Sequence, residues 1–573
     1  MRRNVHLTRP LAVIVFAMKL TWISVRMRLA LLLCCLGVSV AGLALAAPAE
    51  VRGTWLTTTG PNHISSGANT ASVMSDLRDI GLNTVYIETW KQGYTNFPSA
   101  TMQGLIGRDR SPFLGTTRDL VAETIVEAHR NEMNYIGWFE YGFASEFVGT
   151  TSTINTFNNP LTRTMATNGW LLRDQSGRYG NSTNGFAWMN PAVPQVRQLL
   201  IDITLESIAA YDLDGVQFDD RLAWPREFGW DTTTASLYFQ ETGRALPSNI
   251  DDSNFRNWRQ DKVTLFAAEL SAAVRAVRPD LHLSVSPSVT SFSDVNYNAE
   301  WPLWQNLGIF DEYAVQVYRD NIGSFNATMP AQVAQFSGGD LDQFVVGLRG
   351  NGTGANTPYA DLEDMIEGSR NAGAAGHAIF YSKAVRDDYR TQLTAFYDVA
   401  GEGQADNPFF GPNHRPAPTV ATASGFNRWS VDVPADGNYR ILVNNGSRWI
   451  EVSGGWLPAG PRELTLFGAS GVELLVDHRE ADLPDFNGNG EVDVADYTLW
   501  RDTLFSSTDL RADANGDRVV NQLDYDLWNA AFGRSTLSLA TTIPEPTAFG
   551  LLGCLLVAVG GTARNRTVEQ RHR

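Results

Sequence analysis

Residues 211–225 read YDLDGVQFDDRLAWP and contain a strand pattern that ends in two adjacent carboxylates. Val216 and Phe218 are the apolar positions of this pattern, which is typical of a buried strand. Asp219 and Asp220 stand at its carboxyl end. Because successive strand side chains point in opposite directions, only Asp219 lies in phase with Gln217. We therefore expect that both aspartates cannot point along the barrel axis: one faces the substrate and the other points sideways or supports it.

Seven further apolar strand candidates accompany this one between residues 51 and 400, and amphipathic helix patterns separate them. In residues 196–211, for example, Leu199, Ile203 and Ile208 fall on one helical stripe. Alternating strands and helices predict parallel β/α architecture, and eight such units predict a (β/α)8 TIM barrel over residues 48–400. The eight predicted strands are 52–58, 83–90, 135–142, 215–220, 282–288, 312–318, 343–350 and 376–382.

Reactive groups in such barrels lie where the strands end, and this places the two aspartates where chemistry is expected. The structural alternative is that they cap the following turn or pair with Arg221, a common role for aspartate at strand ends. Two long excursions also leave the barrel, one from about Ala144 to Pro191 and one from Leu222 to about Asp261. We expect the first, which contains Trp170 and Trp188, to shape a substrate site.

Several phrases of the barrel region resemble the glycosyl hydrolase-like 10 family. They are GTWLTT, GLNTVYIETW, AHRNEMNYIGWFEYG, MNPAVPQVRQLL and above all YDLDGVQFDDRLAWP, and they extend over about residues 50–400. The resemblance implies a (β/α)8 barrel that hydrolyses O-glycosidic bonds in a polysaccharide or a bacterial-wall glycan. The spacing from Asp214 to Asp219 is also similar to the α-amylase pattern, which implies that Asp219 is the nucleophile.

A glycosidase needs a second carboxyl group as general acid. The amylase pattern places it at the end of the fifth strand, where this chain has Ser286 and Ser288. The remaining candidates are Glu140, Glu88 and Asp220, of which Glu140 is the best placed. We expect its aromatic neighbours, Trp138 among them, to raise its pKa. The other strand ends offer side chains for sugar contacts, each of which has an equal structural alternative: Trp90, Trp138, Asn190, Arg221, Gln316, Tyr318 and Arg349.

An internal repeat follows near the C-terminus, in residues 485–496 (DFNGNGEVDVAD) and 513–524 (DANGDRVVNQLD). Oxygen donors at positions 1, 3, 5, 9 and 12, with a carbonyl at position 7, match the Ca²⁺ loop of an EF-hand. The expected ligands are Asp485, Asn487, Asn489, Glu491, Asp493 and Asp496 in the first loop, and Asp513, Asn515, Asp517, Val519, Asn521 and Asp524 in the second.

The pair, with its flanks at 483–535, resembles a type I dockerin, which implies Ca²⁺-dependent folding and a cohesin-like partner. Arg518 departs from the pattern, because it occupies the turn position that Gly490 fills in the first loop. The alternative, an acidic solvated linker, explains neither the spacing nor the repeat. Catalysis in the barrel needs no cofactor on this interpretation. Between the barrel and the repeat, alternating segments in 401–482 predict a small β-sandwich, in which Trp449 and Trp456 pack in the core rather than bind sugar.

The two ends of the chain predict export. Residues 1–47 contain an apolar run after Arg26 and Arg28 and are interpreted as a secretory signal. The segment 536–573 has Pro544-Glu545-Pro546, an apolar run and two arginines, and it resembles a PEP-CTERM sorting signal. That resemblance implies an exosortase-type enzyme as partner; the alternative is a short membrane anchor. We expect an extracellular or cell-surface protein that meets the membrane only through its terminal segments.

Composition excludes two classes of function. The formal net charge of −17 argues against nucleic acid as a partner, because phosphate binding relies on clustered Lys and Arg. The only cysteines, Cys34, Cys35 and Cys554, lie in the terminal apolar segments, so the body of the chain carries no thiol chemistry. Two hypotheses remain for the barrel: a glycoside hydrolase acting on a glycan substrate, or a non-catalytic carbohydrate-binding or scaffold protein that keeps the barrel shape.

Overall fold

The computed structural model of the chain describes most of residues 49–532. The exceptions within that range are residues 337–339, 353, 399–403, 411–417, 426, 435–436, 445–448, 458, 466–472, 479–483, 488–491, 510 and 515–518. The predicted export signal and the predicted sorting tail therefore lie outside the described residues. No helix among the residues described is both long and apolar enough to cross a membrane.

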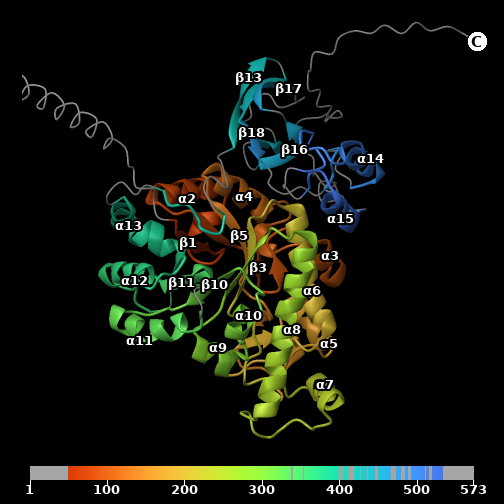
Figure 1. Cartoon of the computed structure of the whole chain (residues 1–573). Coiled ribbons are helices and arrows are strands. Elements are labelled where there is room, and N and C mark those ends of the chain that lie inside the picture. Colours follow the sequence, from red (N-terminus) through yellow and green to blue (C-terminus); the bar gives the residue numbers. More distant parts are fainter. Residues whose placement is uncertain are drawn as a thin grey trace, which may run out of the picture. The chain divides into compact units, whose positions relative to one another are not determined.

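Eight parallel strands close into a barrel in the order β1-β12-β11-β10-β9-β8-β5-β2 (Figure 1). Each overlaps one of the eight ranges predicted from the sequence, so the TIM barrel is confirmed. The strands are β1 (Val51–Leu56), β2 (Thr84–Glu88), β5 (Asn134–Phe139), β8 (Gly215–Asp219), β9 (His282–Ser286), β10 (Glu312–Gln316), β11 (Phe344–Arg349) and β12 (Gly376–Phe380).

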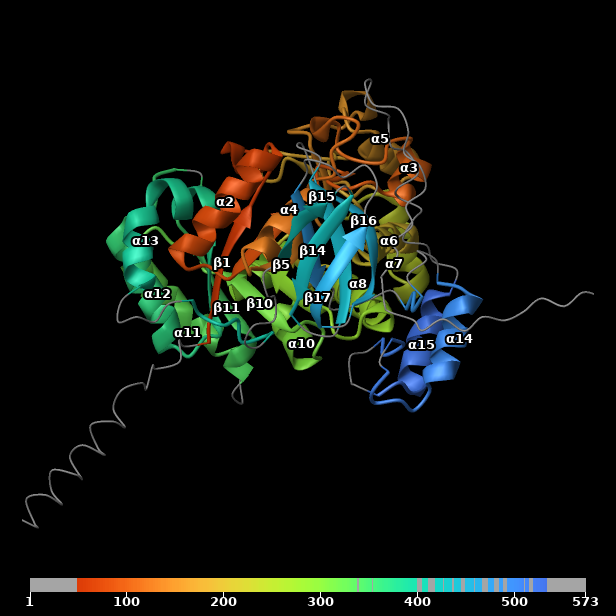
Figure 2. The ribbon, with the colours of Figure 1, turned by 90° about the horizontal axis from the view of Figure 1, so that it is seen from above.

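Helices surround the barrel (Figure 2), and their buried stripes match the predicted periodicity. Leu199, Ile203 and Ile208, for example, are all buried on α6. The helices between the strands are α2 (Gly67–Ile80), α4 (Leu120–Arg130), α6 (Pro194–Ala210), α8 (Ser253–Val277), α10 (Trp301–Asn306), α11 (Ile322–Val333), α12 (Tyr359–Asn371) and α13 (Arg390–Tyr397).

Smaller elements build the loops that follow the strands. The excursion after β5 contains a two-stranded antiparallel sheet, β6–β7, whose strands are separated in sequence by a short helix, and the excursion after β8 contains one helix before α8 begins. These elements are β3 (Trp90–Lys91), β4 (Tyr94–Thr95), α3 (Ala100–Ile106), β6 (Ala144–Phe147), α5 (Pro160–Thr167), β7 (Phe186–Trp188), α7 (Thr232–Thr242) and α9 (Thr290–Tyr297). Single-turn segments are η1 (Asn62–Ile64), η2 (Pro112–Leu114), η3 (Ile154–Thr156), η4 (Asp340–Gln343) and η5 (Ala384–Asp388).

The barrel interior is closed by side chains from alternate strand positions, including the stacked rings of Trp55 and Tyr86, whose centroids lie 5.1 Å apart. Several polar groups among them are linked by hydrogen bonds. Trp55 Nε1 donates to Gln217 Oε1 at 2.7 Å, and Gln217 Nε2 donates to Ser284 Oγ at 2.8 Å. Ser284 Oγ in turn donates to Glu312 Oε1 at 2.7 Å. This linked network costs little free energy to bury because its donors and acceptors are matched. It holds in place the interior side chains that lie below the carboxyl ends of the strands.

Residues 419–478 form a six-stranded antiparallel sheet in the order β16-β15-β18-β13-β14-β17. The predicted strands are confirmed, and their division into two sandwich layers stays a prediction. Trp449 is buried and donates to Glu127 Oε1 at 2.7 Å, in agreement with the expected packing role; the side chain of Trp456 is outside the description. The strands are β13 (Thr419–Gly425), β14 (Arg428–Val433), β15 (Gly437–Asn444), β16 (Trp449–Leu457), β17 (Gly460–Thr465) and β18 (Glu473–His478).

Candidate active site

The carboxyl ends of the barrel strands meet in one place, which we call the mouth, and three predicted carboxylates lie there in phase with the barrel interior. Glu88 stands two positions after the interior residue Tyr86, and Glu140 stands two positions after the interior residue Trp138. Asp219 stands two positions after Gln217. Their strands, β2, β5 and β8, are neighbours in the barrel. The period of two along a strand therefore carries all three side chains into the mouth.

Asp219 is fixed through one of its carboxyl oxygens. Oδ1 accepts a hydrogen bond from Gln316 Nε2 at 2.5 Å and another from the Asp220 backbone N–H at 2.7 Å. Gln316 Nε2 also donates to the Ser286 carbonyl at 3.0 Å, so strand β9 holds the amide in place. The second oxygen, Oδ2, lies 3.9 Å from Arg221 Nη1. Asp219 is 6% exposed. The side chain thus has one clamped oxygen and one that faces a cation.

Asp220 points to a different neighbour, as strand alternation predicts. Its Oδ2 accepts a hydrogen bond from Ser288 Oγ at 3.2 Å, beyond the end of β9. Burial raises the pKa of Asp219 well above its usual value, and the charge of Asp220 raises it further. Burial also raises the pKa of Asp220. Both shifts favour the protonated form of these neighbouring carboxyls relative to exposed aspartates.

Glu88 and Glu140 form a second acidic pair, and Lys91 lies between them. Lys91 Nζ contacts Glu88 Oε1 and lies 3.3 Å from Glu140 Oε2. Glu88 is fully buried and also accepts from the Thr57 hydroxyl at 2.6 Å and from the Thr58 backbone N–H at 2.8 Å. Glu140 is the more accessible member, with 17% of its side chain exposed. Of the two, only Glu140 has solvent-exposed side-chain surface.

The charges at this pair correct one expectation from the sequence. Burial acts to raise the pKa of Glu140, as its aromatic neighbours suggested, but Arg221 and Lys91 outweigh burial and the pKa is lowered. Burial raises the pKa of Glu88 to about 7, with the charge of Glu140 adding to the rise and Lys91 opposing it. Glu140 is therefore ionised at neutral pH, and the proton that the sequence placed on it resides elsewhere.

Arg221 joins the two acidic pairs. Its Nη1 donates to the Glu140 carbonyl at 3.1 Å and to Glu140 Oε1 at 3.4 Å, in addition to its approach to Asp219. Burial acts to lower the pKa of Arg221, but the acidic side chains around the guanidinium, Glu140 first, outweigh burial and raise the pKa above its usual value. Gly142 makes this approach of the two loops feasible. Its φ is +43°, and a Cβ there would lie 2.4 Å from the Arg221 carbonyl oxygen, so only glycine fits.

The remaining predicted contacts divide into two groups. Gln316, Tyr318 and Arg349 belong to β10 and β11 or directly follow them at the mouth, where Arg349 pairs with Asp320. Trp90 and Asn190 are fully buried. The Trp90 indole donates to the Gly142 carbonyl at 3.1 Å, and Asn190 donates to Thr234 Oγ1 at 2.9 Å. In this structure the last two side chains pack within the loops that support the mouth.

Trp138 lies beneath the carboxylates and is 2% exposed, and the described atoms offer its indole nitrogen no hydrogen-bond partner.

Sequence reasoning missed Lys91, Thr57 and Thr58, which hold Glu88. Lys91 follows Glu88 by three residues in the phrase ETWK, and this spacing is the one signal that pointed to it.

The duplicated acidic loops flank two helices, α14 (Val494–Thr503) and α15 (Gln522–Ala531). Asp496 accepts from the Asn487 and Asp493 backbone N–H groups at 3.0 and 2.8 Å. Asp524 accepts from the Ala514 and Asn521 N–H groups at 2.7 and 2.6 Å. The described part of the chain has no cluster of three His, Cys, Asp or Glu groups arranged for a metal ion. Asn489, Glu491, Asn515 and Asp517 lie outside the described residues.

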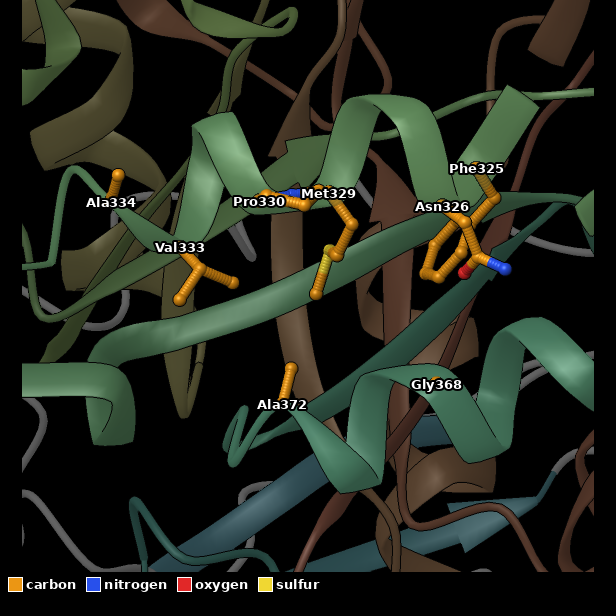
Figure 3. Close-up of a pocket in the computed structure, with 8 residues that line it drawn as sticks. All are labelled: Phe325, Asn326, Met329, Pro330, Val333, Ala334, Gly368 and Ala372. Carbon is orange, nitrogen blue, oxygen red and sulfur yellow. The ribbon is translucent and has the colours of Figure 1, made fainter. Parts of the chain in front are cut away.

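A surface groove of 410 Å³ between α11 and α12 is separate from the mouth (Figure 3). None of the mouth carboxylates lines it, and no charged side chain does. It is lined by Phe325, Asn326, Met329, Pro330, Val333, Ala334, Gly368 and Ala372. A groove without an ionisable group does not supply acid or base chemistry, so the mouth is the candidate active site.

Comparison with known proteins gives relatives of one kind for the barrel region. The chain is similar to the glycosyl hydrolase DigH of Escherichia coli K12 and to that of Shigella flexneri, each 25% identical over 272 residues. The match covers 43% of this chain and spans 56% of the length of those relatives.

Solved structures that match this chain include the PgaB (BpsB) glycoside hydrolase domain from Bordetella bronchiseptica. It is 16% identical, with a TM-score of 0.41, over 60% of this chain and 99% of that one. The catalytic domain of a β-amylase from Paenibacillus polymyxa is 8% identical, with a TM-score of 0.41, over 62% of this chain and 99% of that one. The family model described as glycosyl hydrolase-like 10 matches residues 50–350, which is more than half of the 573 residues. The chain therefore belongs to the glycosyl hydrolase-like 10 family.

Proposed function

We propose that this protein is an exported glycoside hydrolase that cleaves O-glycosidic bonds in a polysaccharide or a bacterial-wall glycan, with Asp219 and Glu140 as the reacting carboxyls. The observation that carries the proposal is that the pKa values of these two groups are shifted in opposite directions. Asp219 has a raised pKa and Glu140 a lowered one, although both contact the same guanidinium. Glycosidic bond cleavage needs one carboxylic acid and one carboxylate on the two sides of the bond.

In this scheme Asp219 protonates the leaving oxygen, and the Glu140 carboxylate stabilises the developing positive charge at the anomeric carbon, either as nucleophile or by activating water. Arg221 keeps Glu140 ionised, and Gln316 orients Asp219 by holding Oδ1. This assignment exchanges the roles that the α-amylase spacing implied for Asp219. Asp220 helps to keep the pKa of Asp219 high through its charge, and Glu88 positions Lys91 against Glu140 without reaching the substrate. Tyr318 and Arg349 are proposed to contact the sugar, whereas the buried Trp138 supports the carboxylates from within the barrel.

The test is hydrolysis by the full chain of wall glycans and of α- and β-linked polysaccharides, with reducing ends and products measured. The wild type is expected to release new reducing ends from at least one substrate. Asp219→Asn is expected to lower that rate by on the order of 10³-fold or more, because the proton donor is lost. Asp364→Asn is the matched control, since Asp364 is exposed on α12. Equal rates for the wild type and Asp219→Asn, with folding unchanged, would remove Asp219 from the mechanism. Glycan binding without turnover would favour the carbohydrate-binding alternative.

We also propose that the duplicated loops bind Ca²⁺ and that the module docks onto a cohesin-like partner. The donor chemistry in the described part fits a hard cation: burial raises the pKa of Asp496, and the nearby charges of Asp485 and Asp493 raise it further. A bound cation would offset that crowding of carboxylates. Chelation of Ca²⁺ is expected to lower the melting temperature of this module in calorimetry of the full chain. An unchanged transition would contradict the proposal. Export through the N-terminal signal and sorting by an exosortase-type enzyme complete the proposed setting.

A further inference from the structure

The two-stranded β6–β7 sheet carries an exposed aromatic ring that the catalytic scheme does not use. Strands β6 and β7 pair in antiparallel fashion, and Phe147 stands directly opposite Phe186. Phe147 is 64% exposed, whereas Tyr141, at the base of the same excursion, is 6% exposed. An exposed phenylalanine by itself needs no explanation. The arrangement of its neighbours is what distinguishes this one.

The rings form a continuous series that leads to Arg221. The centroids of Phe147 and Phe186 lie 5.2 Å apart with the ring planes at 78°, and those of Phe186 and Tyr141 lie 5.8 Å apart at 82°. The Arg221 guanidinium lies 5.0 Å from the Tyr141 centroid and 5.1 Å from that of Phe186. Since Arg221 contacts both reacting carboxyls, the series connects the reacting groups with the surface of the β6–β7 sheet.

The exposed ring is also held in place. A Cβ at Gly185 would lie 2.7 Å from an atom of the Phe147 ring, so the ring rests directly against that backbone. Asn184 Oδ1 accepts from the Phe186 N–H at 3.3 Å and from Trp188 Nε1 at 3.0 Å, which fixes β7. Glu146, beside Phe147, accepts from the Asn158 N–H at 2.9 Å and the Asn159 N–H at 3.2 Å. A ring that is both exposed and braced presents a fixed apolar surface to a ligand.

We propose that Phe147, braced by Phe186, is a stacking platform for a sugar ring of the glycan chain, at a subsite beyond the bond being cleaved. The identity of the ligand rests on the proposed function. An aromatic face covers the apolar C–H face of a pyranose and asks for no charge from the ligand. The ring series reaches the site through Arg221, and this continuity indicates the occupant: a glycan chain that lies across the carboxyls extends along the β6–β7 sheet. A glycan too short to reach that sheet does not use the platform.

The test measures binding separately from hydrolysis. In the Asp219→Asn full chain, calorimetric titration gives the affinity for oligosaccharides of increasing length, derived from wall glycan strands, chitin, cellulose and starch. Adding Phe147→Ala is expected to weaken the longest bound oligosaccharide by about three- to tenfold and to leave the shortest unchanged. Phe147→Trp is expected to restore or exceed the original affinity, because the larger ring keeps the stacking surface.

Phe239→Ala is the matched control, because this ring is 59% exposed on α7, outside the β6–β7 sheet. Affinity for long and short chains that is unchanged by Phe147→Ala overturns the platform, as does an equal loss at every length. Hydrolysis by the wild type with no effect of Phe147→Ala leaves the proposed function intact and rejects the platform alone. Length-dependent binding through Phe147 in a protein that hydrolyses nothing supports the platform and rejects the hydrolase.

Discussion

The two acidic pairs at the mouth have the same composition in outline, two carboxyls on or beside neighbouring strands, but they differ in where the positive charge lies. Lys91 stands inside the Glu88–Glu140 pair, 3.3 Å from Glu140, and Arg221 approaches the same glutamate at 3.4 Å. The Asp219–Asp220 pair has the Arg221 guanidinium only at 3.9 Å from Asp219. Burial acts on both pairs, yet the pKa of Glu140 is lowered and those of both aspartates are raised.

This difference shows that burial raises the pKa of a carboxyl in the mouth unless two cations lie beside it, as Lys91 and Arg221 do at Glu140. Glu88 has Lys91 beside it and Asp219 has Arg221, but burial still raises the pKa of both carboxyls. The second cation beside Glu140 is what favours its ionised form. The pKa shifts thereby favour the acid form of Asp219 on β8 and the carboxylate form of Glu140 directly after β5, as the proposed glycosidic cleavage requires.

The largest expected effect separates the two members of the glutamate pair. Glu140→Gln is expected to lower kcat/KM by on the order of 10³-fold, because the accessible carboxylate is lost. Glu88→Gln is expected to lower it by only about tenfold, because Glu88 is buried and acts through Lys91. Steady-state kinetics on the substrate cleaved by the wild type measure both, and thermal unfolding checks that each variant is folded. A larger loss for Glu88→Gln than for Glu140→Gln would reverse the assignment.

The fold was accessible from sequence because each barrel strand is a short apolar run with a helical pattern after it, and local periodicity suffices to recognise both. The phase of Glu88, Glu140 and Asp219 also follows from that periodicity. The charge on Glu140 did not follow. Its sequence neighbours Trp138, Phe139 and Tyr141 suggested a raised pKa, whereas Arg221, 81 positions away, supplies the cation that lowers it. The clamp of Thr57 and Thr58 on Glu88 likewise joins β1 to β2 and leaves no trace in either segment alone.

A smaller effect is expected when one cation is removed from the glutamate pair. Lys91 favours the ionised form of Glu140, so Lys91→Met is expected to raise the pKa of that carboxyl. The acidic limb of the kcat/KM profile, below which Glu140 is protonated and inactive, is then expected to move up by about one pH unit. Lys91→Arg keeps a positive charge and is the matched control, with a limb close to that of the wild type. A limb unchanged in Lys91→Met would contradict the role given to this lysine.

The division of charge is tested most directly in the protein without substrate, by ¹³C NMR titration of labelled Asp and Glu carboxyls in the full chain. The Asp219 and Glu140 signals are assigned by their loss in Asp219→Asn and Glu140→Gln. The account predicts that Asp219 titrates well above the usual range of an aspartate and Glu140 below that of a glutamate. In Lys91→Met the Glu140 titration is expected to move upward, whereas that of Asp219 is not. An Asp219 carboxyl that is ionised at acidic pH beside a Glu140 that keeps its proton near neutrality would contradict it.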